Sequence, residues 1–169
     1  MAFMSISGNA DPILSALDAI AAIGTRPQAV LDAIGGELRD RTVQRMERGV
    51  DPDGIRWESY AALNPLYEMD KQTDNILIES GALRASIEPE VDGSTLLVGT
   101  RLIYGAIHQF GGIIQPREKL QLSFVMGGEL FHVSSVHIPA RPYLGLGVGD
   151  EAAIIDRLDE FLSIAMRGR

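Results

Sequence analysis

The stretch Tyr104-Gly105-Ala106-Ile107-His108-Gln109-Phe110-Gly111-Gly112 is the centre of the fold that the sequence predicts. Four of its residues recur at the i, i+3, i+4, i+7 spacing of one helical face, and the Gly111-Gly112 pair is expected to end the helix. The segments before it have the patterns of helices and a hairpin. Those after it indicate a second hairpin, a proline-bounded loop and a helix. No set of catalytic residue types gathers around it in the sequence, which weakens an enzymatic interpretation.

Outward from this stretch, hydrophobic periodicity predicts an α+β domain. We expect an antiparallel sheet of two hairpins, packed with N-terminal helices, the short central helix and a C-terminal helix. The hairpins are expected near residues 85–99 and 120–136, and the last helix from about residue 150. All 169 residues are expected to form a single domain, with a helical extension (1–24), a long helix (25–49), an irregular loop (50–75) and an α+β core (76–169).

Two local patterns refine this outline. Thr25-Arg26-Pro27-Gln28 has the form of a capping box, which predicts that the long helix begins there. Trp57, the only tryptophan, lies in the irregular loop between the turn Asp51-Pro52-Asp53-Gly54 and the breaker Asn64-Pro65. Because a long loop in a compact domain is usually functional or held by a buried residue, we expect Trp57 to be a structural anchor.

The composition narrows the class of protein. Hydrophobic residues make up 46% and charged residues 22%, which is typical of a folded globular chain. The chain has no cysteine, so disulfides and cysteine nucleophiles are excluded, and synthesis in a reducing compartment is expected. Its formal net charge of −8 opposes free binding to nucleic acid. No basic residue precedes Arg26 and no uncharged apolar run could span a bilayer, so neither a signal peptide nor membrane contact is expected.

The sequence offers little chemistry. It has no G-x-S-x-G elbow, no Walker glycine-lysine pair and no H-E-x-x-H motif. His132 and His137 are five residues apart on one expected strand, so they are predicted to face opposite sides. The glycines of Gly145–Gly149 precede a helix, but Asp150 and Glu151 put negative charge where a phosphate would bind, and both carboxylates are expected on a solvated surface. We therefore expect no catalytic residue, no metal and no cofactor.

Three arginines, Arg41, Arg45 and Arg48, fall on one face of the long helix at i, i+4 and i+7. One interpretation is a solvated stripe that is partly balanced by Glu37, four residues before Arg41. The other is a docking strip for an acidic partner surface or for a passing DNA backbone. The sequence leaves both open.

Several segments together resemble the phage virion morphogenesis family, the tail-completion proteins of Mu-like and P2-like phages. The resemblance extends over roughly residues 45 to 165, and its motifs keep one order and spacing. The residues that carry it are Asp51-Pro52-Asp53-Gly54 with Trp57, then residues 76–87, Val98-Gly99-Thr100, Tyr104 to Gly112, and Ile138 to Gly145.

This resemblance implies a structural virion protein at the head-tail junction or upper tail end, assembled in the host cytoplasm. Such a protein is needed for tail completion and head-tail joining, and no catalysis is attributed to it. We expect it to act as a homo-oligomeric ring, a hexamer, beside head-connector, tail-terminator or tail-tube proteins. DNA would only pass through the lumen, where an acidic wall prevents tight phosphate contacts.

A ring subunit needs aromatic and arginine side chains at its interfaces. Besides the three helix arginines, the interface candidates lie in the central stretch and in the proline-bounded loop: Tyr104, His108, Gln109, Phe110, Arg141 and Tyr143. The alternative is that Tyr104, Ile107 and Phe110 pack into the core. The rival function is a small hydrolase or ligand-binding domain with a pocket around His108.

Overall fold

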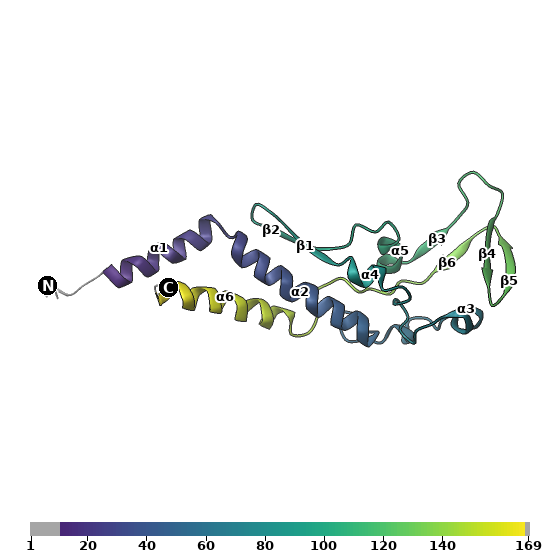
Figure 1. The fold of residues 1–169 in the computed structure, drawn as a ribbon, viewed down its shortest axis with the longest axis horizontal. Helices are drawn as coiled ribbons and strands as arrows, with labels where there is room; N and C mark the ends of the chain where they lie inside the picture. Colours follow the sequence, from purple (N-terminus) through teal and green to yellow (C-terminus); the bar gives the residue numbers. More distant parts are fainter. Residues whose placement is uncertain (1–10, 168–169) are drawn as a thin grey trace, which may run out of the picture.

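The computed structural model describes residues 11–167, so the first ten residues of the expected 1–24 extension lie outside it. The helices are α1 (Asp11–Thr25), α2 (Gln28–Arg48), α3 (Pro65–Asp70), α4 (Ala82–Ala85), α5 (Gly105–Phe110) and α6 (Asp150–Met166), with a 3₁₀ turn η1 (Trp57–Ser59). The strands are β1 (Glu88–Asp92), β2 (Thr95–Gly99), β3 (Gly112–Ile114), β4 (Leu122–Met126), β5 (Glu129–Val133) and β6 (Val136–Ile138). Figure 1 shows an elongated subunit with the long helices at one end and the β4–β5 hairpin at the other.

The α+β class is confirmed, and both expected hairpins form. Glu88 lies opposite Gly99 in the first hairpin, and Leu122 lies opposite Val133 in the second. The hairpins do not join in one sheet, because each is a separate two-stranded sheet. A third antiparallel pair, β3 with β6, was not predicted. The chain leaves β5 before β6 begins, so His132 and His137 lie in different sheets and the prediction of one shared strand is wrong.

Helix α2 connects the helical end to the sheets. It packs against β1 and β2 on one side and against α6 on another, and α1 packs against α6 beyond the start of α2 (Figure 1). Val30, Ile34 and Met46 give α2 its buried face. Gly35 allows β1 to approach closely, because a Cβ there would lie 2.7 Å from the Cβ of Pro89.

Two expected local structures are corrected. Thr25 does not cap α2: its hydroxyl donates to the carbonyls of Ala21 and Ala22, both at 3.2 Å, at the end of α1. The loop 50–75 is less irregular than expected, because it contains η1 and α3. The Asn64-Pro65 pair begins α3, where the Asn64 side chain accepts a bond from the Leu66 N–H at 2.9 Å.

The core lies where loop 50–75 meets the chain on both sides of α5. Trp57 is fully buried there among Met46, Leu83, Ile87 and Tyr143. Its indole N–H donates to the Pro142 carbonyl at 2.8 Å, so the ring ties the loop to the proline-bounded segment 85 residues later. Burial and this bond together make Trp57 the point at which loop 50–75 is held.

We predict that Trp57→Ala lowers the free energy of unfolding by about 3–5 kcal/mol, because it leaves a large cavity in the core. Trp57→Phe keeps an aromatic ring in the core but leaves the Pro142 carbonyl without its hydrogen-bond donor. This variant should lower the free energy of unfolding by about 1–3 kcal/mol. Urea unfolding followed by far-ultraviolet circular dichroism measures both. Equal midpoints for the two variants would show that the hydrogen bond, and not the packing, is what matters.

Candidate functional site

The central helix α5 is joined to the proline-bounded segment by Gln109. Its side-chain oxygen accepts bonds from the backbone N–H groups of Tyr143 (3.0 Å) and Leu144 (2.9 Å). Its amide nitrogen donates to the Leu144 carbonyl at 2.9 Å. Three hydrogen bonds of one side chain therefore fix the position of α5 on segment 139–145, and they use both acceptor positions of the amide oxygen and one N–H of the amide nitrogen.

Tyr143 and Arg141 complete this junction from the other side. The Tyr143 ring is buried, and its hydroxyl donates to the Gly105 carbonyl at 3.1 Å. Arg141 is buried as well; its guanidinium donates to the Ala61 carbonyl at 2.9 Å, and its backbone N–H donates to the His108 carbonyl at 2.7 Å. Both residues were interface candidates, and the structure places both inside the subunit.

His108 borders an open hollow of about 240 Å³ that is also lined by Tyr104, Glu79 and Ser80. Burial, with the charge of Arg141 adding to it, holds the pKa of His108 below its ordinary value, and its ring Nδ1 has no partner. A base in this position needs a nucleophile within hydrogen-bond reach. None of the hydrogen bonds in the described part of the chain joins the His108 ring to Ser80 or Glu79.

The neighbours of His108 are engaged elsewhere. Glu79 pairs with Lys71 at 2.9 Å, and the Ser80 hydroxyl accepts from the Ala82 N–H at 3.3 Å. The hollow therefore offers a neutral imidazole beside an ion pair and a helix start. This arrangement lacks the nucleophile–base–orienter chain that the rival hydrolase function requires.

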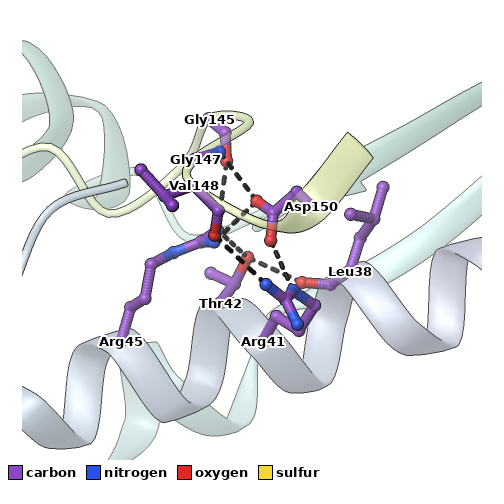
Figure 2. Close-up of polar contacts among 8 residues, drawn as sticks. All are labelled: Leu38, Arg41, Thr42, Arg45, Gly145, Gly147, Val148 and Asp150. Carbon is purple, nitrogen blue, oxygen red and sulfur yellow. Dashed lines mark hydrogen bonds and ion pairs between the residues drawn. The ribbon is translucent and has the colours of Figure 1, made fainter. Parts of the chain in front are cut away.

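A second polar centre forms around Asp150, the first residue of α6 (Figure 2). Its fully buried carboxylate accepts from the Arg41 guanidinium, from the Arg45 guanidinium at 2.7 Å and from the Gly147 N–H at 2.8 Å. Arg45 also donates to the Gly145 carbonyl at 3.0 Å, and Arg41 donates to the Val148 carbonyl at 3.3 Å. One carboxylate thus binds α2, α6 and the glycine-rich loop between residues 145 and 149 together.

The pKa of Asp150 reflects two opposed effects. Burial by itself raises the pKa, but the hydrogen bonds from Arg41, Gly147 and Arg45, with the charge of Arg45, outweigh it and bring the pKa below its ordinary value. The group is therefore ionised at neutral pH. The prediction of a solvated carboxylate at Asp150 is wrong, because the two arginines of α2 compensate its burial.

The same contacts test the two interpretations of the arginine stripe on α2. Arg41 and Arg45 turn toward Asp150, so the solvated-stripe interpretation is wrong for Arg45, which is nearly covered, and incomplete for Arg41. Glu37, expected to balance Arg41, pairs with Arg157 of α6 at 3.1 Å. Arg48 stays exposed at the end of α2. Of the three, Arg48 alone is exposed rather than half-buried.

Large apolar side chains project from the surface around α5. Phe110 is 79% exposed and Ile103 is 96% exposed, while Tyr104 and Ile113 are also exposed. The alternative that Tyr104 and Phe110 pack into the core is wrong, although Ile107 is half-buried. We call Ile103, Tyr104, Phe110 and Ile113 the α5 patch. Ile103 was not a candidate, because a lone isoleucine before the motif carries no periodic signal.

Residues 11–167 offer neither a metal site nor a membrane-spanning helix. No group of three His, Asp or Glu side chains within residues 11–167 could hold a metal ion. Among the helices of that range, none is both long enough and apolar enough to cross a membrane.

Comparisons with protein families and with curated proteins both point to phage proteins. The sequence profile of the phage virion morphogenesis family matches residues 9–163. The chain is 30% identical over 169 residues to a protein of Escherichia phage Mu named "Putative capsid assembly protein G", with 97% of each chain covered. It is 28% identical to the Mu-like prophage FluMu G protein 2 of Haemophilus influenzae, over 94% of this chain and 95% of that protein. No solved structure gives a significant match.

We predict that Asp150→Asn lowers the free energy of unfolding at pH 7 by about 3 kcal/mol, because two guanidinium groups lose their counter-ion. This loss of stability is at the low end of the range for breaking a buried ion pair, because the Arg41 side chain is partly exposed to solvent. A carboxyl whose pKa is lowered by folding stabilises above its unfolded pKa and loses that effect as the pH falls. The difference between wild type and variant should therefore shrink below about pH 4. Urea unfolding at several pH values measures this, and a difference that grows with acidity would contradict it.

Proposed function

Since the chain belongs to the phage virion morphogenesis family, we propose that it is a structural subunit of the virion at the head-tail junction or the upper end of the tail. In this role a ring of copies completes the tail and joins it to the head, and no bond is made or broken. The Mu relative's name refers to capsid assembly, which agrees with an assembly role.

The observation that carries this proposal is the surface of the subunit. Its accessible area is 11918 Å², whereas a folded monomer of its mass exposes about 8,100 Å². The twelve residues outside the described range cannot account for the difference. Assigning them the surface of an unfolded chain, about 1,900 Å², leaves about 10,000 Å² for the described residues. A folded monomer of their mass exposes about 7,700 Å², so roughly 2,300 Å² of excess remains. A standard interface removes about 800 Å² from each partner, so the excess is more than enough for the two interfaces that a ring subunit forms.

The polar groups support the same role. At the α5 junction and at Asp150, the side chains of Gln109, Arg141, Tyr143, Arg41 and Arg45 are bonded within the subunit, so they build a rigid body. The α5 patch, by contrast, leaves apolar side chains at the surface. The net charge of −8 suits a conduit through which DNA passes without tight phosphate contacts. Partners above and below the ring would be head-connector, tail-terminator or tail-tube proteins.

We predict that the purified chain forms a closed oligomer. Size-exclusion chromatography with light scattering should give a single species, for a hexamer six times the 18.3 kDa subunit mass. A purified chain that remains monomeric both alone and with the neighbouring tail proteins would exclude the ring.

The virion role has a genetic test. A phage that lacks this gene should produce DNA-filled heads and separate tails but few joined particles, visible by negative-stain electron microscopy. A plasmid copy of the wild-type gene should restore infectious particles. Normal virions in the absence of the gene would rule out the role, and empty or malformed heads would place the protein in head assembly instead.

A further inference from the structure

An apolar hollow of about 310 Å³ opens between α2, β2, α6 and the loop that follows Tyr143. Most of the side chains that line it are aliphatic, and these come from four separate parts of the chain: Ile34, Leu38, Leu96, Val98, Leu144 and Ile154. Leu146, 67% exposed, also borders the hollow. An apolar cavity of about 150 Å³ accommodates benzene. This hollow therefore has room for an aromatic ring together with an aliphatic neighbour.

The α5 patch offers a projecting side chain for the hollow. Phe110 is the last residue of α5, and the neighbouring Gln109 fixes that helix on segment 139–145 through three hydrogen bonds. Its ring is thus a projecting aromatic group on a fixed base, with Ile103 and Ile113 exposed in the same part of the chain. Fixed aromatic side chains that enter a pocket are the usual hot spots of protein interfaces.

Charge also favours these two surfaces. Copies of a chain with net charge −8 repel one another, so they approach best where neither surface carries a carboxylate. None of the four residues of the α5 patch carries a carboxylate or a basic group. Among the residues that line the hollow, the single ionisable one is Arg45, which is paired with Asp150. The contact would therefore bury no unpaired charge.

Resting on the ring proposed above, we propose that Phe110 of each copy enters the hollow of the next copy, with Ile103 beside it. The patch comes from α5 and the residues on either side of it, and the hollow comes from α2, β2, α6 and the loop after Tyr143. Because the two surfaces share no residue, each subunit uses one toward each neighbour. Such a head-to-tail contact produces a closed ring when its rotation closes, whereas a two-fold contact stops at the dimer.

The test uses one variant on each surface. Phe110→Ala removes the projecting ring, and Leu146→Asp places a carboxylate at the mouth of the hollow. Both side chains are largely exposed, so thermal melting of each variant should match that of the wild type. Matched controls make comparable changes elsewhere. Leu120→Ala truncates another exposed apolar residue, and Val148→Asp places a carboxylate at a residue that is 84% exposed, two residues after Leu146 and outside the lining of the hollow. Each test variant should weaken self-association at least about 30-fold, and the controls should not.

A mixture of the two test variants shows whether the contact joins Phe110 of one copy to the hollow of another. The Leu146→Asp chain keeps an intact Phe110, and the Phe110→Ala chain keeps an intact hollow. An equimolar mixture should therefore give a one-to-one dimer by light scattering, although each variant alone is monomeric, and the dimer cannot grow into a ring.

Three outcomes would contradict the proposal. If the mixture gives no dimer while the wild type forms rings, this contact is overturned and the ring remains. A wild-type chain that never oligomerises would overturn both. Controls that weaken the ring as much as the test variants would also overturn this contact, since the effect would not be local.

Discussion

The buried carboxylate of Asp150 is the constraint on which the rest of the structure depends. It begins α6 within reach of two arginines of α2, so it fixes the angle and register of the two long helices. Its bond to the Gly147 N–H also orders the loop that leads back to Tyr143 and Gln109. Gly147 lies so close to Pro52 that a Cβ there would be 1.8 Å from the Pro52 carbonyl oxygen, which brings the turn before Trp57 into the same unit.

The consequence is a subunit whose polar side chains serve its own rigidity. Gln109, Arg141 and Tyr143 hold α5 in place, and Asp150 holds the helices and the glycine-rich loop. Two apolar features remain open at the surface: a projecting aromatic group at α5 and a mainly aliphatic hollow beside α2. A chain with these properties exposes more surface than a folded monomer of its mass, and association is the physical way to remove that excess.

The sequence predicted the elements better than their contacts. The long helices, both hairpins and the short helix before Gly111 follow from periodicity and glycine positions, which are local signals. The pairing of β3 with β6 was missed, because three-residue strands that pair across more than twenty residues leave no periodic pattern. Asp150 was assigned to the surface since a carboxylate at a helix start is normally solvated. Its burial depends on Arg41 and Arg45, over a hundred residues earlier, and no spacing rule reports that. The burial of Arg141 and Tyr143 was missed for the same reason, because both depend on contacts with loop 50–75 and α5.

The most direct test of the central claim is the surface that each subunit loses on assembly, measured from an electron cryo-microscopy map of the phage neck with this chain fitted. Our account predicts a ring in which every subunit buries at least about 1,600 Å² against its neighbours, with Phe110 covered. A subunit present as a single copy, or one that buries less than about 800 Å² with Phe110 in solvent, would contradict it.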